Sequence, residues 1–463
     1  MIKLEKYKPN KQTQKIIYVM TCILLVAFGA IFLYKSYALY EEKKDFNVIN
    51  GQVEEPGDLY FAYYVNGTIS KDVPTKDSGL TLDITKSSCN SGVTVSWDDE
   101  NWHAILDYST YTANSTTRTK CTLYFKSKPV MATTLLNNLV SGANKSSTDV
   151  YTVPDKEGDS CTYTFGYDGT TDNNLRYVGN NPCNYVKIDD ELWRIVGVMN
   201  NIDEGTGNKE SRLKLIQSER IGNYSWDKSE SSVNDGSGVN EWSQADLMKL
   251  LNPGYESESV GGSLYYNGGS GTCYVGLNNG TTACDFTSSG LKENLKALIG
   301  DTVWNTGSND GVTYTYNNII ASKFYELERS SNTGKICSSG SLCNDTVERT
   351  TIWTGKVGLI YPSDYGYATS GGSTNNRTSC LNTNLSSWNS YSDCYNNDWL
   401  GSSGWTISPY ARSSNANNVF YVYRYVSYTN AFNSSGVRPS VYLKSDVTIT
   451  GGEGTEENPY TIG

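Results

Sequence analysis

The chain of 463 residues contains a single histidine, His103. Serine-histidine-aspartate triads and most zinc and iron sites depend on imidazole groups, so this scarcity excludes a triad from the C-terminal half of the chain and any multi-histidine metal site. His103 follows Trp102 in an apparent strand, where an ordinary surface or half-buried residue is expected. Any chemistry of the protein must therefore come from other side chains.

Basic residues are also scarce relative to acidic ones. Lysine and arginine number 38 against 49 aspartates and glutamates, for a net charge of −11. Nucleic-acid-binding proteins need basic stripes that displace counterions, so we expect no nucleic-acid partner. Phenylalanine is rare, with 10 residues against 36 tyrosines and 43 glycines, a balance typical of short strands and polar loops. The length predicts two or three folded units, because single cores stop growing beyond roughly 250–300 residues.

No Cys-x-x-Cys motif occurs among the 11 cysteines. Together with the shortage of histidine, this disfavours metal binding. Cys22 lies in an apolar N-terminal run, and the even number beyond it is typical of disulfides formed in an oxidising compartment. The sequence does not fix the connectivity. Pairing sequence neighbours closes the shortest loops and gives these candidates: Cys89 with Cys121, Cys161 with Cys183, Cys273 with Cys284, Cys337 with Cys343, and Cys380 with Cys394.

An apolar run without charges extends from residue 16 to residue 34. At about 1.5 Å per residue it approaches the roughly 30 Å hydrocarbon core of a bilayer, so residues 16–38 are predicted to form a transmembrane anchor. Five lysines between residues 3 and 15 precede it, which predicts a cytoplasmic tail at residues 1–15 and a single-pass protein of the cell membrane whose remaining domains are extracellular. A cleaved signal peptide is the alternative, although no small-x-small cleavage site follows.

Beyond the anchor the pattern changes twice. Residues 45–128 contain short apolar strands separated by turn residues such as Asn66-Gly67, the spacing of an immunoglobulin-like β-sandwich, here expected to act as a spacer. Residues 129–172 begin with a short predicted helix at 132–140. The polar stretch that follows is interpreted as a linker, with an extended hairpin as the alternative.

The C-terminal region, residues 173–463, is predicted to be α+β with an antiparallel sheet and two or three helices. Strands are expected at 185–188, 192–198 and 213–216. They are followed by helices near 243–251, 291–299 and 318–328, and then by more strands joined by long loops.

Five motifs in this region carry a resemblance to a known family. They are Trp193–Gly197, Trp242–Leu247, Gly355–Tyr365, Trp405–Pro409 and Gly436–Leu443. In this order they resemble a recurring exported domain of Gram-positive (Firmicutes) gut bacteria, a surface-protein family of unassigned function. The closing Gly-Val-Arg-Pro strand is similar to the ending of the formylglycine-generating enzyme branch of C-type lectin-like folds. The resemblance implies a C-type lectin-like domain over roughly residues 173–463.

The functional motifs of those relatives are largely missing. Lectins that hold sugar through calcium use Glu-Pro-Asn or Gln-Pro-Asp followed by Trp-Asn-Asp, and the chain has none of these. Formylglycine-generating enzymes bind copper through two reactive cysteines, and only Cys380 and Cys394 correspond to them; a plain disulfide is expected instead. Glu453, Glu456 and Glu457 in the terminal loop offer clustered oxygens of the kind that calcium prefers, without EF-hand spacing. We therefore predict no cofactor, with calcium as the alternative.

The tyrosine-rich segment before the last strand is the predicted contact surface. If a strand covers residues 419–426, alternate side chains place tyrosines on its outer face. Tyrosine gives large amphipathic contact area, and asparagine adds adaptable hydrogen bonds, as in antibody-like binding surfaces. The candidate ligand-binding residues are Tyr421, Tyr423, Tyr425, Tyr428, Asn430 and Asn433. Similar residues vary before the final strand in receptor-binding proteins diversified by retroelements.

Other conspicuous side chains are expected to be structural. Asp189-Asp190 is predicted to form a hairpin turn, and Asp364 a turn or helix cap after Pro362. We also expect a structural role for Trp388, Trp399, Trp405 and Arg438.

These features predict a membrane-anchored, extracellular binding or adhesion protein of a Gram-positive cell envelope. Its ligand is expected to be a glycan or a surface protein. An enzyme is the first alternative, either a formylglycine-type oxidase or a wall-acting hydrolase. A structural, pseudopilin-like envelope subunit is the second, although no Gly-Phe-Thr-x-x-Glu processing site precedes the apolar run.

Overall fold

The computed structural model describes residue 11 and residues 59–463, apart from 77–78, 91, 99, 111–118, 129, 158–160, 231–235, 310–315, 335–346 and 413–414. The expected tail at 1–15 and anchor at 16–38 lie outside the described residues, residue 11 excepted. Within the described part of the chain, no helix is long and apolar enough to cross a membrane. The chain divides into two compact units, Met1–Lys126 and Ser127–Gly463.

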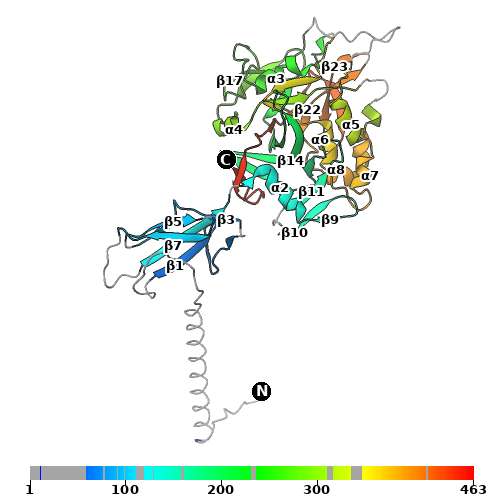
Figure 1. Cartoon of the computed structure of the whole chain (residues 1–463). Coiled ribbons are helices and arrows are strands. Elements are labelled where there is room, and N and C mark those ends of the chain that lie inside the picture. Colours follow the sequence, from blue (N-terminus) through cyan, green and yellow to red (C-terminus); the bar gives the residue numbers. More distant parts are fainter. Residues whose placement is uncertain are drawn as a thin grey trace, which may run out of the picture. The chain divides into compact units, whose positions relative to one another are not determined.

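The described part of the first unit, from residue 59 on, consists of short strands in two sheets (Figure 1). One sheet has the order β2-β1-β7-β3, with β4 also paired to β7, and β5 and β6 form a separate hairpin. The strands are β1 (Leu59–Val65), β2 (Thr68–Ser70), β3 (Leu80–Leu82), β4 (Ser88–Cys89), β5 (Thr94–Asp98), β6 (His103–Asp107) and β7 (Thr119–Ser127). Leu123 and Phe125 of β7 share a core with Val95 and Ala104 of the hairpin. The immunoglobulin-like assignment stays a prediction.

The second unit is built on a sheet of 12 strands. Its order is β8-β27-β28-β13-β14-β12-β11-β10-β9, while β15 joins β14 to β26, and β26 pairs with β21. Neighbours are antiparallel except β13 and β28, which run parallel. The strands are β8 (Val130–Met131), β9 (Asn144–Lys145), β10 (Tyr151–Glu157), β11 (Thr162–Tyr167), β12 (Leu175–Tyr177), β13 (Tyr185–Ile188), β14 (Glu191–Asp203), β15 (Lys209–Gln217), β21 (Val357–Gly358), β26 (Ser440–Tyr442), β27 (Thr448–Gly451) and β28 (Tyr460–Ile462).

Smaller sheets and short helices surround this sheet. The strands are β16 (Gly222–Ser225) with β25 (Ser434–Val437), β17 (Ser270–Tyr274) with β18 (Thr281–Asp285), β19 (Thr302–Asn305) with β20 (Ile352–Gly355), and β22 (Gly404–Arg412), β23 (Asn415–Val422) and β24 (Val426–Asn430) together. The helices are α2 (Ala132–Ser141), α3 (Asp246–Leu251), α4 (Glu293–Leu298), α5 (Ala321–Glu328), α6 (Pro362–Tyr367), α7 (Arg377–Leu381) and α8 (Ser392–Asn396), with 3-10 turns η3 (Trp242–Gln244), η4 (Tyr316–Asn318) and η5 (Leu385–Ser390).

The predicted α+β class is confirmed, but two expectations for the second unit are wrong. The described part of residues 173–463 contains six α-helices, not two or three. The extra helices α6, α7 and α8 have only five or six residues each, too few for a helical repeat to show in the sequence. The helix expected at 132–140 is confirmed as α2. The polar stretch after it is no linker, because it supplies strands of the main sheet, and the antiparallel pairing of β10 with β11 agrees with the alternative of an extended hairpin.

Strand β14 is central in this sheet, because it pairs with β12, β13 and β15. Trp193, Ile195 and Val198 along it are all buried in the main core. Gly197 faces strand β12 so closely that a Cβ there would lie 2.1 Å from the main-chain oxygen of Leu175. The glycine therefore permits the close approach of two central strands.

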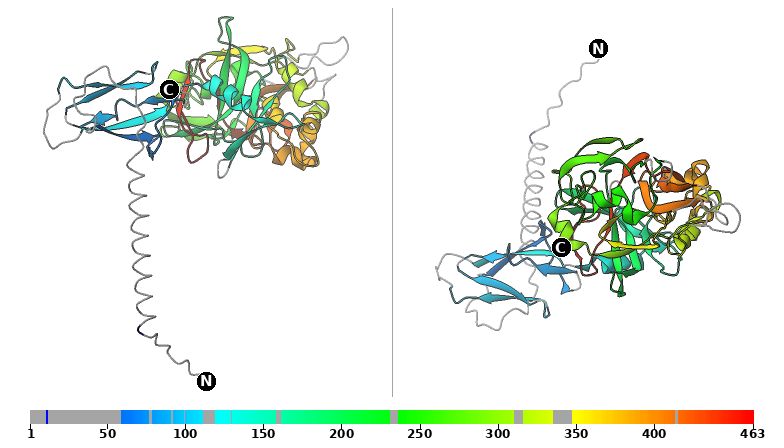
Figure 2. Two further views of the ribbon diagram at one scale, coloured as in Figure 1. Left: turned by 60° about the horizontal axis from the view of Figure 1, so that its bottom comes forward. Right: turned by 90° about the horizontal axis from the view of Figure 1, so that it is seen from above.

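Helices α5 to α8 gather on one side of the second unit, in yellow-green to orange in Figures 1 and 2. Each contacts the next, α5 with α6, α6 with α7, and α7 with α8. The disulfide between Cys380 and Cys394 links α7 directly to α8. This helical group forms one wall of the candidate site.

Candidate functional site

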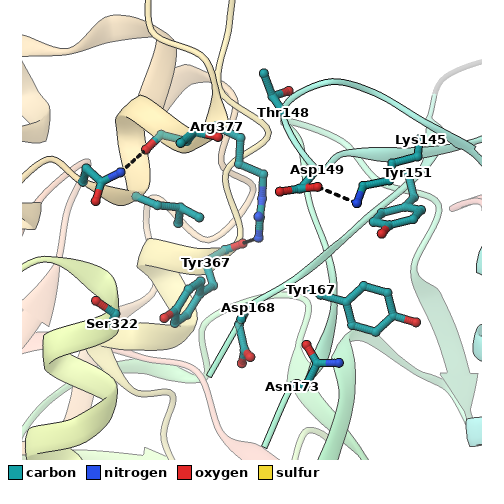
Figure 3. Close-up of a pocket in the computed structure, with 14 residues that line it drawn as sticks. Lys145, Thr148, Asp149, Tyr151, Tyr167, Asp168, Asn173, Ser322, Tyr367 and Arg377 are labelled. Carbon is teal, nitrogen blue, oxygen red and sulfur yellow. Dashed lines mark hydrogen bonds and ion pairs between the residues drawn. The ribbon is translucent and has the colours of Figure 1, made fainter. Parts of the chain in front are cut away.

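A cavity of about 610 Å³ lies where segments distant in the sequence meet (Figure 3). Strands β9 and β10 with their loop border it, as does the loop after β11, and helices α5, α6 and α7 complete it. Its lining residues are Lys145, Thr148, Asp149, Tyr151, Tyr167, Asp168, Gly169, Asn173, Ser322, Tyr367, Arg377, Thr378, Leu381 and Asn382. The lining thus combines three tyrosine rings with hydroxyl, amide and charged groups.

One wall of the cavity comes from the hairpin of β9 and β10. Lys145 and Asp149 form an ion pair of 2.7 Å there, and the ammonium lies 5.4 Å from the centre of the Tyr151 ring. Tyr151 meets Tyr167 edge to face, with ring centres 5.6 Å apart. The two rings hold each other in a fixed orientation at the cavity wall.

Asp168 belongs to the loop between β11 and β12, and every hydrogen bond that it accepts comes from nearby in the sequence or from strand β12. Its oxygens accept from the Thr170 hydroxyl at 2.7 Å, the Asn174 amide at 2.8 Å and Arg176 Nε at 3.1 Å. Burial opposes the charge of Asp168, but Arg176 and these hydrogen bonds outweigh it and lower its pKa. Asp168 is therefore a charged group that is already fully engaged.

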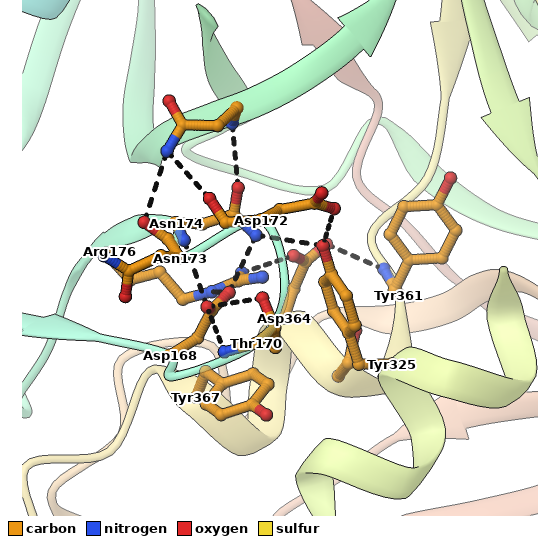
Figure 4. Close-up of polar contacts among 12 residues, drawn as sticks. Asp168, Thr170, Asp172, Asn173, Asn174, Arg176, Tyr325, Tyr361, Asp364 and Tyr367 are labelled. Carbon is orange, nitrogen blue, oxygen red and sulfur yellow. Dashed lines mark hydrogen bonds and ion pairs between the residues drawn. The ribbon is translucent and has the colours of Figure 1, made fainter.

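A chain of buried charges continues from Asp168 into the core (Figure 4). Arg176 also donates to Asp364 at 2.7 Å, and the Lys214 ammonium lies 2.5 Å from the other oxygen of Asp364. Burial by itself raises the pKa of Asp364, but Lys214 and Arg176 hold it well below its usual range. Asp364 also accepts from the main-chain N–H of Tyr361 at 2.9 Å, the predicted helix cap.

Lys214 ends this chain in an aromatic enclosure. Its ammonium lies 4.2 Å from the ring centre of Tyr361 and 5.3 Å from those of Trp304 and Tyr442. Burial lowers the pKa of Lys214 to about 8, against the pull of Asp364. The ammonium has one carboxylate and three aromatic rings around it, all of which favour its charged form.

Arg377, the first residue of α7, lines the cavity in a different electrostatic setting. Only 2 % of it is exposed, and its guanidinium donates to the main-chain oxygens of Thr369 at 3.2 Å and Tyr367 at 3.4 Å. Burial lowers its pKa to about 10. Among the described residues no carboxylate lies within 4.0 Å of it, whereas Asp168 and Asp149 are paired with other cations.

The predicted contact surface of tyrosines does not form one strand face. Strand β23 ends at Val422 and β24 begins at Val426, so the expected strand over 419–426 is wrong. The chain reverses at Arg424, whose φ is 59°, and the main-chain N–H of Tyr423 donates to the oxygen of Tyr425. A positive φ at a turn is incompatible with continuous alternation.

The individual residues of that surface have separate environments. Tyr423 is 54 % exposed, whereas the ring of Tyr421 contacts buried Trp405 and that of Tyr428 stacks 4.3 Å from Tyr410. Asn433 donates to the Thr429 hydroxyl and, through its main chain, to Asn430. The structure therefore brings these residues to one hairpin and its neighbourhood, with Tyr423 as the exposed ring.

Four of the five predicted cysteine pairs are confirmed as disulfides. They are Cys89–Cys121, Cys161–Cys183, Cys273–Cys284 and Cys380–Cys394. Cys337 and Cys343 lie outside the described residues. Trp388, Trp399, Trp405 and Arg438 are buried, and Arg438 Nε donates to the main-chain oxygen of Gln217.

The described residues contain no group of three or more histidine, cysteine, aspartate or glutamate side chains placed to hold a metal ion. Glu453, one of the residues considered for calcium, accepts instead from the Asn458 amide at 3.3 Å. The predicted hairpin turn at Asp189 is present, with a φ of 54°.

Sequence reasoning missed Arg377, which lines the cavity, and the buried cations Arg176 and Lys214 behind it. The three are separated by long stretches of chain, and no spacing rule connects them. The one available signal is position, since Arg176 lies in the short strand β12 and Lys214 is flanked by leucines in β15. Comparison with known proteins adds no further assignment: no family model, curated protein or solved structure matches the chain.

Proposed function

We propose that this protein is a membrane-anchored extracellular binding protein whose second unit holds a carbohydrate in the cavity bordered by Tyr151, Tyr167 and Tyr367. The observation that carries the proposal is the composition of the cavity wall, in which three tyrosines lie among hydroxyl, amide and charged side chains. The anchor at residues 16–38 and the four disulfides support an extracellular location. The C-type lectin-like assignment of residues 173–463 is part of the same proposal.

The cavity wall matches the chemistry of a sugar ring. Each sugar has an apolar face of C–H groups that packs against an aromatic ring, and hydroxyls around its edge that need hydrogen-bond partners. Tyr151 and Tyr167 supply ring faces and edges, while Asn173, Thr148 and Asn382 supply amides and hydroxyls. A volume of about 610 Å³ lies within the usual range of small-ligand sites.

The cavity explains binding better than the hairpin that carries Tyr423. Of the predicted tyrosines, Tyr421 and Tyr428 pack against other rings, so Tyr423 is the strongly exposed ring of the hairpin. A ligand in the cavity would instead contact groups from three separate segments of the chain. Enclosure of this kind removes much of the ligand surface from water and so favours affinity.

The test is glycan-array binding by the full-length protein, purified in a detergent without a sugar headgroup. The array should include host glycans and bacterial wall polysaccharides. Tyr151→Ala should weaken binding roughly tenfold, the effect of losing one stacked ring. Tyr423→Ala is the matched control, since it removes an exposed tyrosine outside the cavity and should leave binding unchanged.

The result also decides between the two surfaces. Loss of binding in Tyr423→Ala with none in Tyr151→Ala would move the site to the hairpin. Absence of any glycan binding by the wild-type chain would refute the proposal. Thermal unfolding of each variant shows whether a change in binding reflects a change in folding.

A further inference from the structure

We infer that the ligand of this cavity is an acidic sugar, whose carboxylate pairs with the guanidinium of Arg377. The inference rests on the proposed carbohydrate-binding function and specifies the class of sugar. Two observations support it: the charged side chains that line the cavity, and the space that the fold leaves for the guanidinium of Arg377.

Arg377 is the cation of the cavity that forms no ion pair within 4.0 Å among the described residues, and Asp168 and Asp149 attract it only from farther away. Its two hydrogen bonds go to main-chain oxygens, at 3.2 and 3.4 Å, which do not neutralise its charge. Arg176, one layer deeper, contacts two carboxylates at 3.1 and 2.7 Å. Lys145, at the cavity wall, has Asp149 at 2.7 Å. A buried charge without a counter-ion is costly, and an anionic ligand removes that cost.

The two acids that line the cavity are committed elsewhere. Asp168 accepts from Arg176, Thr170 and Asn174. Asp149 is exposed on the opposite hairpin and paired with Lys145. Figure 3 shows Arg377 extending toward Tyr367, with the carboxylate of Asp149 pointing toward the Arg377 side chain. Arg377 is therefore bordered by a carboxylate that is already paired with Lys145.

Two other buried arginines show why the cavity matters. Arg194 and Arg438 also bond only neutral oxygens among the described residues. Arg194, however, is enclosed by the rings of Tyr185 and Trp399, at 4.3 and 4.5 Å. Neither arginine lines this cavity. Arg377 alone of the three is placed where a ligand in the cavity can reach it.

The fold reserves room for this guanidinium. Gly166 of β11 lies against it, and a Cβ at that position would be 2.7 Å from Arg377 Cζ. Any larger residue would push the guanidinium away from its present position. Because the planar guanidinium can form two parallel hydrogen bonds to a carboxylate, a sugar acid is the ligand that matches both the cation and the neighbouring rings.

The experiment uses pairs of oligosaccharides that differ by one acidic group. Suitable probes are glucuronate-terminated against glucose-terminated, galacturonate-terminated against galactose-terminated, and sialylated against desialylated glycans. The full-length protein should bind an acidic member at least tenfold more tightly than its neutral counterpart. Arg377→Gln should reduce that preference at least tenfold, and Arg377→Lys should retain part of it.

Gly166→Ala is the decisive second variant, because it displaces the flexible end of Arg377 without removing a charge. It should weaken the acid preference in the same direction while its near-ultraviolet circular dichroism matches the wild type. Asp149→Asn should strengthen acid binding two- to threefold, since it removes the carboxylate that repels the ligand. If Arg377→Gln does not fold, Gly166→Ala decides alone.

The outcomes separate this inference from the proposed function. Equal binding of acidic and neutral members, with loss in Tyr151→Ala, would overturn the acid preference and leave the carbohydrate site intact. An acid preference that Gly166→Ala and Arg377→Gln both retain would also overturn the assignment to Arg377. Failure of every glycan to bind would refute both proposals.

Discussion

Asp364 is the carboxylate on which two buried cations depend, so its replacement by asparagine tests the electrostatics of the core. It is 2 % exposed and accepts from Lys214 at 2.5 Å, Arg176 at 2.7 Å and the Tyr361 main chain at 2.9 Å. Asparagine keeps the shape and one acceptor oxygen but loses the charge. Two charge-assisted hydrogen bonds of about 1.5–3 kcal/mol each are affected, so Asp364→Asn should lower the free energy of unfolding by about 3–5 kcal/mol.

The same structure predicts which second substitution repairs the damage. In Asp364→Asn the Lys214 ammonium has no carboxylate, whereas Arg176 keeps Asp168 at 3.1 Å. Lys214→Met removes the stranded charge, and the thioether suits the surrounding rings of Trp304, Tyr361 and Tyr442. The double variant should therefore recover about 2 kcal/mol relative to Asp364→Asn. Urea unfolding followed by tryptophan fluorescence measures all three variants against wild type.

Two results would refute this reasoning. One is a cost of less than about 1 kcal/mol for Asp364→Asn, which would mean that the charge network contributes little. The other is an additive loss in the double variant. Acid provides an independent check: the folded pKa of Asp364 lies below the unfolded value of about 3.9, so its stabilisation is complete above that pH. The advantage of wild type over Asp364→Asn should shrink by about 1.4 kcal/mol per pH unit below it.

Three further predictions concern other parts of the second unit. Burial and the neighbouring Asp246 raise the pKa of Asp227 to about 7, so the folded state binds more protons than the unfolded state between roughly pH 4 and 7. Stability should fall as the pH rises through this range, and Asp227→Asn should reduce that slope in urea titrations, because Asp227 and Asp246 titrate as a pair. Replacing Cys161 and Cys183 by alanine opens a loop with a sequence separation of 22 and should cost roughly 3 kcal/mol in the same assay. Gly197→Ala places a Cβ 2.1 Å from a main-chain oxygen of β12 and should cost about 3 kcal/mol, measured by thermal unfolding.

Local patterns predicted the elements with strong periodicity. The helices expected at 243–251, 291–299 and 318–328 correspond to α3, α4 and α5, and the strands at 185–188 and 213–216 to β13 and β15. Each has apolar residues at regular spacing or a distinct turn signal beside it. In the segment 129–172 the helix expected at 132–140 corresponds to α2. Strands β10 and β11 were missed because they contain Pro154 and Gly166, residue types that are uncommon inside strands.

Local sequence patterns could not predict the candidate site or the buried charges behind it. Lys214 lies between Leu213 and Leu215, an alternation that predicts an exposed lysine on a half-buried strand. In the structure the sheet is covered on both faces there, and Lys214 meets a carboxylate 150 positions along the chain. Arg176 and Asp364 are separated by 188 positions. Ion pairs of this kind depend on tertiary packing. A single sequence does not indicate which two distant charged residues will be in contact.

The charge network also explains why Arg377 remains available to a ligand. Asp168, Arg176, Asp364 and Lys214 form an alternating series of two carboxylates and two cations, so the network is neutral as a whole. Because Asp168 is hydrogen-bonded to Arg176, it attracts Arg377 from a distance but forms no ion pair with it. If Asp168 were released, it could pair with Arg377 and compete with an acidic sugar. Arg176→Gln should therefore weaken the preference for an acidic sugar as well as lower stability, because it removes the guanidinium that pairs with Asp168 at 3.1 Å.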